Sequence, residues 1–380
     1  MQYGCDIGRS FTAIPPGAIL PGSMPDFRIF IRSNNRYILW AREGNTVTVE
    51  QLKKLADGPN EVYIDVEDGF KYDQYLETYL GDILKKEEPS NQQKAEIFSR
   101  VTNKVIGQTF AKTQSIGTLP QGVADRVKTV VENALFFIAE TKSLEALSKI
   151  IGHDYKTYEH ATKVMWLTVL FLKENSDILE QIEPDYVHFT EHEKKKLLEQ
   201  CGVAAILHDI GKVFVPTEIL NKNGPLNEVE WEIVKRHPFG SLALLLDTGI
   251  PTFVKKAVLH HHEDFKGGGY PIGVAGDDIH PLARVIKIAD VFDAMTSKRP
   301  YKDAMVPAEA IKIMVGTRSA DNGNGRQNRD SGMKHCFDEK YLRKFVVLLG
   351  KLPATAQRKQ TSMVGTICNK QKAGSYTAMH

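Results

Sequence analysis

The sequence predicts an α+β module at the N-terminus followed by an all-α domain. Three observations lead to this fold class. Strand-like segments fall before residue 70, whereas almost every segment between residues 92 and 350 has helical spacing. All 12 histidines lie after residue 152, and ten of them fall between His153 and His280. At 380 residues the chain is long enough for two domains, and imidazole chemistry belongs to the second one.

The first part, residues 1–90, is predicted to be a small regulatory or sensory module. Residues 27–32 (FRIFIR) and 37–42 (YILWAR) flank a short turn and predict a β-hairpin. Thr48 can cap a short helix that ends near Gly58. A strand over 61–66 and a helix over 72–84 complete the module. This part contains no P-loop, no CxxC pair and no cluster of ligand-type residues.

Stretches rich in glycine and polar residues divide the rest of the chain into segments. Residues 91–120 are expected to form a helical linker, which Gly117–Gly122 interrupts, and residues 121–350 the helical catalytic domain. Residues 316–332, rich in Gly, Asn, Ser and Arg, indicate a long insertion between helices. Residues 351–380 carry five Lys or Arg and no acidic residue, and we expect a disordered tail.

Composition narrows the class of partner. A formal net charge of +2 gives no case for a nucleic acid polymer or an anionic membrane. There is no run of 18 apolar residues and no signal-peptide pattern, so we expect no membrane insertion. The four cysteines are scattered, which favours a cytoplasmic protein without a disulfide framework.

The first chemical signal is the motif HDIGK at residues 208–212, at the end of a helix predicted over 193–207. Neighbouring helical residues project roughly 100° apart, so His208 and Asp209 can serve two metals, or one metal and a bridging carboxylate. An HD pair alone is better explained by a capping Asp beside a surface His. His237 follows the segment 227–236, where Pro238 must break or kink the helix.

Further candidates lie downstream and upstream of this motif. On the helix predicted over 251–264, His261 and His262 extend the inward face set by Val254 and Val258. Asp290 stands among apolar residues, and a buried carboxylate is costly unless it is paired or bound to metal. His160 begins a strongly apolar helix. Each residue alone is most simply a hydrogen-bonded core histidine or a capping acid. Five histidines and two aspartates without a thiolate together favour iron, manganese or a similar divalent ion over structural zinc.

Five motifs in order carry a resemblance to the HD-GYP proteins, from about residue 121 to residue 350. They are HDIGK, HP at 237–238, HHE at 261–263, GYP at 269–271 and IADVFDAMTSKRPY at 288–301. The resemblance implies an all-α HD-type helical domain with metal-dependent, cytoplasmic phosphodiesterase activity. The implied substrate is cyclic di-GMP, hydrolysed to pGpG, GMP or both by a hydroxide that bridges two metal ions. The first module looks like the small domain that often precedes this one.

The resemblance also implies roles for single residues. The metal ligands would be His160, His208, Asp209, His237, His261, His262 and Asp290. Asp209 would bridge two divalent ions, iron in the first place and manganese as the alternative. Lys212 would contact the scissile phosphate and act with Asp209 in catalysis. The nucleotide would be held by Lys212, Gly269, Tyr270, Arg299 and Lys302. His260 matches no ligand and is expected to be structural. Besides binding cyclic di-GMP, the chain has two further possible kinds of partner: a second copy in a homodimer, or signalling proteins.

Two positions depart from the family pattern. Lys266 replaces the aspartate of HHExxDGxGYP, so the hydrogen bonds that this aspartate would make inside the glycine loop cannot be assumed here. Lys156 stands where some members have a glutamate for a third metal, which favours a two-metal site. Gly267–Gly269 would let the backbone approach a ligand closely. Two alternatives therefore stand beside the enzyme: a weakly active or inactive cyclic di-GMP receptor or scaffold, and an HD phosphohydrolase for another nucleotide.

Overall fold

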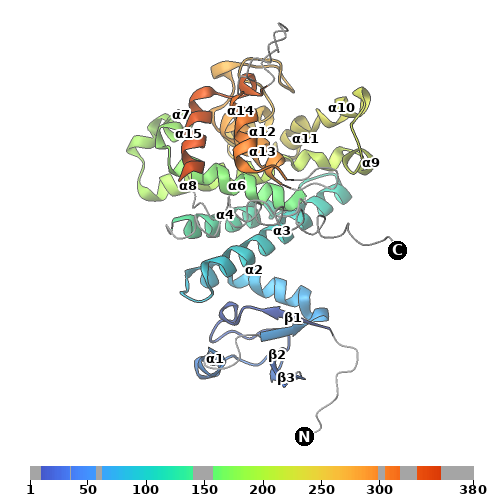
Figure 1. The fold of residues 1–380 in the computed structure, drawn as a ribbon, viewed down its shortest axis with the longest axis vertical. Coiled ribbons are helices and arrows are strands. Elements are labelled where there is room, and N and C mark those ends of the chain that lie inside the picture. Colours follow the sequence, from blue (N-terminus) through green and yellow to red (C-terminus); the bar gives the residue numbers. More distant parts are fainter. Residues whose placement is uncertain are drawn as a thin grey trace, which may run out of the picture. The chain divides into compact units, whose positions relative to one another are not determined.

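The computed structural model describes residues 10–34, 36–56, 62–139, 157–297, 304–316 and 332–351. The chain divides into two compact units (Figure 1). The first comprises the residues up to Gly107 together with those from Glu132 to the end of α4. The second comprises Gln108–Val131 and everything from α6 onward. The boundaries predicted at residues 90, 120 and 350 stay a prediction, and the tail lies almost wholly outside the described residues.

The first unit is built on a four-stranded antiparallel sheet with the order β1-β4-β2-β3. Its strands are β1 (Phe11–Ile14), β2 (Ile29–Ser33), β3 (Arg36–Ala41) and β4 (Val62–Asp65). Its helices are α1 (Val49–Ala56), α2 (Gly69–Lys85) and parts of α3 (Asn91–Ile116) and α4 (Val123–Ala139). Thr48 caps α1 as expected, because its hydroxyl accepts the backbone N–H of Gln51. The hairpin is present, whereas the short strand β1 was not predicted.

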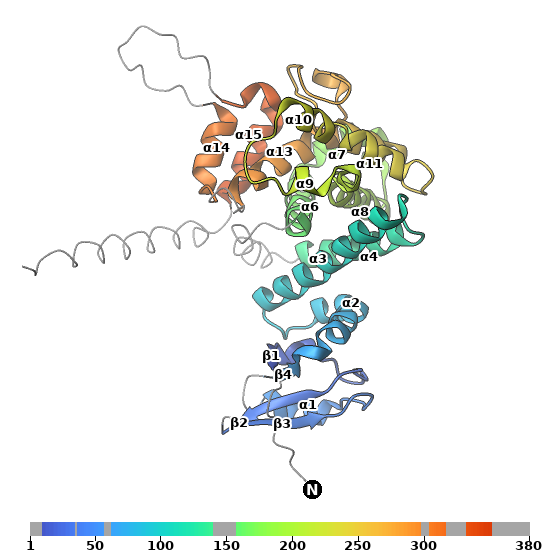
Figure 2. The same cartoon turned by 90° about the vertical axis from the view of Figure 1, so that its right-hand side faces the viewer.

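The second unit is helical (Figure 2). Its helices are α6 (Thr157–Lys173), α7 (Ser176–Ile182), α8 (Glu191–Leu207), α9 (Thr217–Leu220), α10 (Glu228–Val234), α11 (His237–Leu245), α12 (Thr252–His260), α13 (Pro281–Thr296), α14 (Pro307–Val315) and α15 (Glu339–Gly350). Short 3-10 turns join them, among them η4 (Ile210–Phe214) and η6 (Lys334–Cys336). The predicted fold class, an α+β module followed by an all-α HD-type region, is confirmed.

Helix α6 forms the centre of this unit. Every residue from His160 to Leu172 is buried, since α6 packs against both α8 and α13. A helix that is apolar on all sides belongs in the interior, and its few polar residues must find partners there. His160 in the first turn of α6 is buried, so this helix carries an imidazole into the core. None of the described helices combines the length and apolarity needed to cross a bilayer.

One helix ends earlier than predicted. The pattern over 251–264 predicts a helix that includes His261 and His262, but α12 ends at His260 and His261 is its C-cap. The physical reason lies in the two side chains. Neighbouring residues of a regular helix point about 100° apart, so one helix could not direct both imidazoles at one centre. Leaving the helix after His260 allows both rings to do so.

Candidate metal centre

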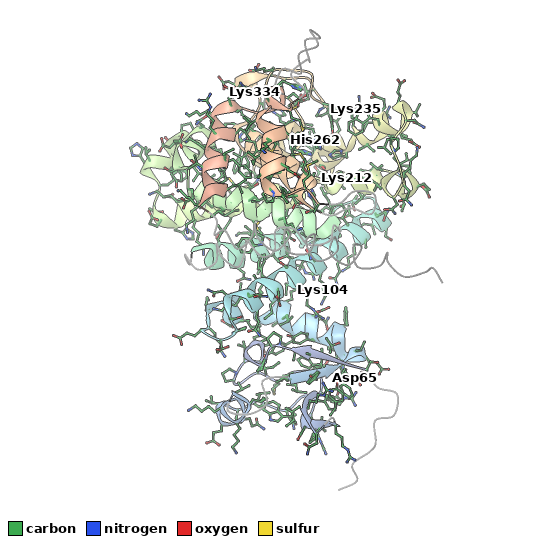
Figure 3. The ribbon with its side chains drawn as sticks, viewed as in Figure 1. Asp65, Lys104, Lys212, Lys235, His262 and Lys334 are labelled. Carbon is green, nitrogen blue, oxygen red and sulfur yellow. The ribbon has the colours of Figure 1, made fainter. Side chains whose placement is uncertain are left out.

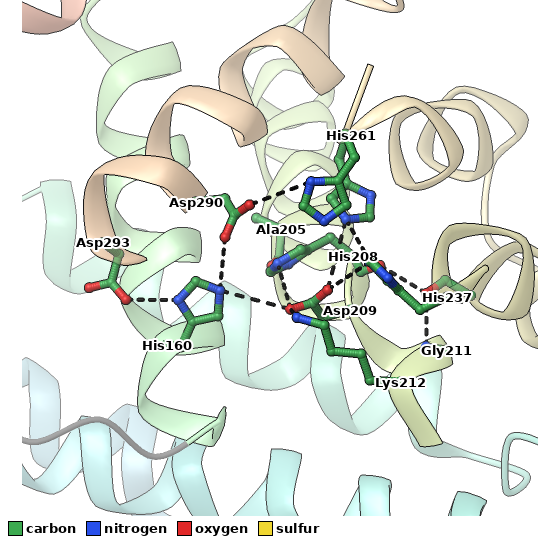
Figure 4. Close-up of polar contacts among 12 residues, drawn as sticks. His160, Ala205, His208, Asp209, Gly211, Lys212, His237, His261, Asp290 and Asp293 are labelled. Atoms are coloured by element: carbon green, nitrogen blue, oxygen red, sulfur yellow. Dashed lines mark hydrogen bonds and ion pairs between the residues drawn. The ribbon is translucent and has the colours of Figure 1, made fainter. Parts of the chain in front are cut away.

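Seven side chains from five elements meet inside the helical unit. Figure 3 labels one of them, His262, and Figure 4 labels the other six. The seven side chains form two groups in which the ligand atoms lie within 4.8 Å of one another. These groups are Asp209 with His237, His261 and His262, and His160 with His208 and Asp290. They include every residue that the resemblance implies as a metal ligand. The His and Asp clusters are able to hold metal ions.

The carboxylate of Asp209 lies between the two groups. Its Oδ1 is 3.1 Å from Nε2 of His237 and 3.8 Å from Nε2 of His261. Its Oδ2 is 3.3 Å from Nε2 of His208 and 3.9 Å from Nε2 of His160. One oxygen therefore faces each group, which is the arrangement a bridging carboxylate needs.

Three of the histidines are oriented by the main chain. The Nδ1 atoms of His208, His237 and His261 lie 2.8, 2.7 and 2.6 Å from the carbonyl oxygens of Ala205, Val234 and Val258. Each carbonyl is three residues earlier, in the last turn of α8, α10 or α12, where carbonyls lack partners within the helix. Because a carbonyl can only accept a hydrogen bond, Nδ1 carries the proton in all three rings. Nε2 is left with its lone pair toward the centre.

This arrangement is unfavourable unless a cation is present. The Nε2 atoms of His237 and His261 are 3.2 Å apart, so two lone pairs face each other. Burial lowers the pKa of His261 to about 4, against the raising effect of Asp209, so the ring is neutral at neutral pH. Among the described residues, Nε2 of His208 and Oδ1 of Asp209 are buried without a hydrogen-bond partner. Buried lone pairs that face one another fit a metal ion, which accepts electron pairs from all of them.

The two carboxylates of the centre are ionised. Burial acts to raise the pKa of Asp209, but the positive charge of Lys212 beside it outweighs burial and holds the pKa well below its usual value. A balance of burial against nearby imidazoles, His160 first, lowers the pKa of Asp290. Anionic oxygen and neutral imidazole together make a donor set for a divalent cation of intermediate hardness.

His160 is oriented by a side chain that the sequence did not single out. Its Nδ1 lies 2.8 Å from Oδ2 of Asp293, and its Nε2 is 3.1 Å from Oδ1 of Asp290 (Figure 4). The other oxygen of Asp293 accepts the hydroxyl of Ser297 at 2.9 Å, and Ser297 in turn accepts Nζ of Lys163 at 3.0 Å. Asp293 lies three residues after Asp290 on α13. That spacing puts both acids on one face of the helix, and this was the signal available.

The glycine of HDIGK is required by packing. A Cβ on Gly211 would lie 2.1 Å from the carbonyl oxygen of His237, so no other residue fits where η4 meets α11. Ser241 joins the two elements: its hydroxyl accepts the N–H of Gly211 at 2.8 Å and donates to the carbonyl of His208 at 2.9 Å. This close approach brings His237 beside Asp209.

Lys212 lies at the edge of the centre. Its side chain is partly exposed, and its ammonium is 2.5 Å from Oδ2 of Asp209. The predicted contact to a phosphate stays a prediction. The position nevertheless puts a positive charge one helical turn after the Asp209 carboxylate, next to both groups of ligands.

The loop after the histidine pair is held by the side chain of Glu263. The family pattern has an aspartate further along this loop, where this chain has Lys266. The buried Glu263 carboxylate accepts the backbone N–H groups of Ile272 at 2.7 Å and Gly273 at 3.0 Å. Lys266 uses its backbone N–H, which donates to the carbonyl of His335 at 3.0 Å. A Cβ on Gly269 would lie 2.2 Å from the backbone nitrogen of Asp264. Only glycine fits at position 269, because the loop there packs directly against the backbone of Glu263 and Asp264.

Aromatic rings continue outward from the centre. Tyr270 stacks on His262, with the ring centroids 4.8 Å apart and the planes inclined by 29°. Trp231 of α10 packs edge to face against Tyr270, with the ring centroids 5.9 Å apart, and it is 45% exposed. The sequence did not identify Trp231, because one aromatic residue in an amphipathic helix looks like a core residue.

Arg299 and Lys302, expected to hold the nucleotide, and Lys156, expected to exclude a third metal, lie outside the described residues. His260 is half-buried, and its Nδ1 accepts the backbone N–H of His280 at 3.3 Å, a structural contact.

Comparison with known proteins agrees with the fold. Residues 184–321 match the model of the HD domain family. A cyclic di-GMP phosphodiesterase of Pseudomonas aeruginosa, PA4108, is 36% identical over 215 residues, which cover 56% of this chain and 44% of that protein. The 3'3'-cGAMP-specific phosphodiesterase 3 of Vibrio cholerae is 42% identical over 111 residues, 29% of this chain and 24% of that protein. The chain thus spans less than half the length of these curated relatives.

The solved structure of Bd1817, an HDG"Y"P protein from Bdellovibrio bacteriovorus, has the same fold. It superposes with a TM-score of 0.54 at 18% identity and covers 90% of this chain and 100% of its own. Together the matches confirm the resemblance to HD-GYP proteins that the motifs carry, and residues 184–321 resemble the HD domain family.

Proposed function

We propose that this HD-domain chain is a metal-dependent phosphodiesterase that hydrolyses a cyclic dinucleotide, cyclic di-GMP in the first place. One observation carries the proposal. Two groups of nitrogen and oxygen ligands lie on either side of the Asp209 carboxylate, and the Nε2 atoms of His237 and His261 are 3.2 Å apart while their Nδ1 atoms are bonded to backbone carbonyls. This donor arrangement is suited to two divalent cations at adjacent positions.

The seven residues of the two groups would hold these ions, with Asp209 between them. Their donors are imidazole and carboxylate without sulfur, which favours iron, with manganese as the alternative. Two divalent ions bound there would supply Lewis acidity and a water of lowered pKa for attack on phosphorus. The chain itself orients the ligands, excludes bulk water from the buried rings and provides further positive charge.

On the substrate side, Lys212 would neutralise charge on the reacting phosphate, since its ammonium already lies beside Asp209 at the exposed edge of the centre. Tyr270 and Trp231 offer ring faces on which a purine can stack. Gly269 would keep the loop in the shape that presents Tyr270. Arg299 and Lys302 are proposed to hold the nucleotide phosphates. The product would be the linear dinucleotide pGpG, GMP or both.

We further propose that the first unit is a regulatory or sensory module. We place the activity in the cytoplasm, the kind of compartment in which free thiols such as those of Cys201 and Cys336 stay reduced.

The relatives favour cyclic di-GMP and supply a second candidate. PA4108 is named for cyclic di-GMP, whereas the Vibrio cholerae protein is named for 3'3'-cGAMP. Both substrates are cyclic dinucleotides with two purines, so the same centre and aromatic rings could serve either. A receptor that binds the messenger without turnover is the rival from another class.

One assay separates these functions. The purified chain is loaded anaerobically with Fe²⁺ or Mn²⁺ and incubated with cyclic di-GMP or 3'3'-cGAMP, and the products are resolved by chromatography. We expect hydrolysis that Asp209→Ala abolishes. Substitution of the exposed His192 on α8 by alanine is the matched control and should leave it intact. Binding without turnover by the fully metallated chain would establish the receptor, and neither binding nor turnover would refute both.

A further inference from the structure

A second cluster of metal-ligating side chains lies apart from the two groups around Asp209. Asp264, His335 and Cys336 each offer one ligand atom, and these atoms lie within 4.8 Å of one another. Sγ of Cys336 is 3.4 Å from Nε2 of His335. Cys336 is buried, Asp264 is half-buried and His335 is exposed, so the cluster is open to solvent on the histidine side.

The backbone fixes these residues next to one another. The N–H of Phe265 donates to the carbonyl of Cys336 at 3.1 Å, and the N–H of Lys266 donates to the carbonyl of His335 at 3.0 Å. The loop that follows the histidine pair is thereby joined to η6, which lies 70 residues further along the chain. The ligand positions are thus set by main-chain pairing and are ready before any ion binds.

The geometry fits tetrahedral zinc. Zn–S and Zn–N bonds of about 2.3 and 2.0 Å at a tetrahedral angle put sulfur and nitrogen roughly 3.5 Å apart. The observed separation in this chain is 3.4 Å. A set of Cys, His and Asp leaves a fourth position for water, and a sulfur donor selects zinc over the harder ions suited to the Asp209 centre.

The charge balance also allows a cation. Nζ of Lys287 lies 2.7 Å from Oδ1 of Asp264 and 3.1 Å from the carbonyl oxygen of His262. Loss of the thiol proton would add a negative charge to that of Asp264. The two anionic ligands would then carry two negative charges, and the Lys287 ammonium at Oδ1 of Asp264 would leave the group with a net charge of −1 toward a cation.

The rival explanation for such a cysteine is a redox-sensitive thiol. Burial, with Asp264 adding to it, raises the pKa of Cys336 to about 11. A thiol of this kind is largely protonated at neutral pH and is a poor nucleophile, so oxidation would be slow. A metal ion, by contrast, binds the thiolate and displaces its proton.

We propose that Asp264, His335 and Cys336 form a site for a thiophilic divalent cation of the zinc class, distinct from the Asp209 centre. An ion bound there ties η6 to the loop that carries Gly269 and Tyr270. The site lies apart from the Asp209 centre, and it does not depend on the proposed activity.

Cobalt provides the test, because Co²⁺ bound to a thiolate gives a charge-transfer absorption that Co²⁺ bound by His and Asp does not. The full chain is purified under reducing conditions, freed of metal and titrated with Co²⁺. We expect thiolate absorption in the wild type and its loss in Cys336→Ser. His335→Asn changes an exposed residue and so leaves the fold intact. It should weaken Co²⁺ binding by more than the roughly 10–100-fold that loss of an outer-shell partner costs.

Cys201→Ser is the matched control, since Cys201 is also a buried free thiol, and it should retain the absorption. Zn²⁺ should displace Co²⁺ and protect Cys336 from alkylation, as mapped by mass spectrometry. The proposal is overturned if Co²⁺ at saturation produces no thiolate absorption, or if the absorption persists in Cys336→Ser. Because the readout is sulfur ligation, it is unaffected by whether the chain hydrolyses a nucleotide.

Discussion

The Nε2 atoms of His237 and His261 lie 3.2 Å apart although both rings carry their proton on Nδ1. Two lone pairs at this distance repel each other, and the packing of α11 against α12 holds them there. A cation bound there would accept an electron pair from each ring and convert this contact into two bonds.

We expect Mn²⁺ to raise the melting temperature of the metal-free chain. At 100 times its dissociation constant, an ion that binds only the folded state stabilises it by about 2.7 kcal/mol. Differential scanning calorimetry with Mn²⁺ and with chelator measures the shift. Asp209→Ala, which removes the shared carboxylate, should show little of it. Equal melting temperatures with and without Mn²⁺ in the wild type would show that these atoms do not form a metal centre.

Lys212→Ala tests whether the lysine acts on the reacting phosphate. A charge that matters mainly in the transition state lowers kcat, so we expect a decrease of roughly 10²–10³-fold, as for loss of one stabilising donor. Metal content, measured by elemental analysis, should be unchanged. Lys235→Ala removes a lysine that pairs with Glu232 and serves as the control. If Lys212→Ala lost metal, its role would instead be to support Asp209.

Trp231→Ala tests the aromatic rings as a stacking surface. Stacking of a base on an aromatic side chain contributes about 1–3 kcal/mol, so KM should rise by roughly 5–150-fold with kcat nearly unchanged. Trp231→Phe should restore most of the affinity, and Tyr270→Phe should act mainly on KM. Trp40→Ala, a tryptophan substitution in the sheet module, is the control. A KM equal to that of the wild type would exclude Trp231 from the substrate site.

Asp293→Ala tests the orientation of His160. Loss of the carboxylate that fixes a ligating imidazole typically weakens metal binding by about 10–100-fold. Titration of the metal-free chain with Mn²⁺ against a competing chelator gives the affinity. Ser297→Ala leaves the carboxylate in place and should have a smaller effect. An unchanged affinity in Asp293→Ala would mean that packing alone orients the ring.

His280 should make stability depend on pH. Its Nδ1 accepts the N–H of Leu282 at the start of α13, and burial lowers its pKa from 6.5 to about 4. Since the folded pKa lies below the unfolded one, the contribution is present above pH 6.5 and is lost as the pH falls toward 4. Denaturant unfolding in chelator should show a shallower acid dependence for His280→Asn, whose amide oxygen can still cap the helix. Identical slopes would contradict this.

The sequence predicted the fold class, and the seven side chains that it singled out as candidate ligands lie together in the structure. His208, Asp209 and Asp290 were identifiable because motifs and buried positions reveal side chains that must be neutralised. Asp293 was missed because an acid one turn along a helix has many simpler explanations. The pairing of residues 264–266 with 335–336 could not be predicted, since a contact across 70 residues depends on packing that no local pattern encodes. Gly269 was expected to approach a ligand, and in the structure it approaches the chain itself.

The carbonyls that orient His208, His237 and His261 also affect how the centre tolerates mutation. Substitution at Ala205, Val234 or Val258 changes a side chain but leaves the orienting oxygen in place, so these positions are constrained only by volume and apolarity. His160 differs, because its orienting atom belongs to Asp293 and is lost by a single codon change. These four histidines therefore differ in how easily a mutation elsewhere can disturb their orientation. Three are oriented by backbone carbonyls, which side-chain substitutions leave in place, and His160 is oriented by a side chain that a substitution can remove.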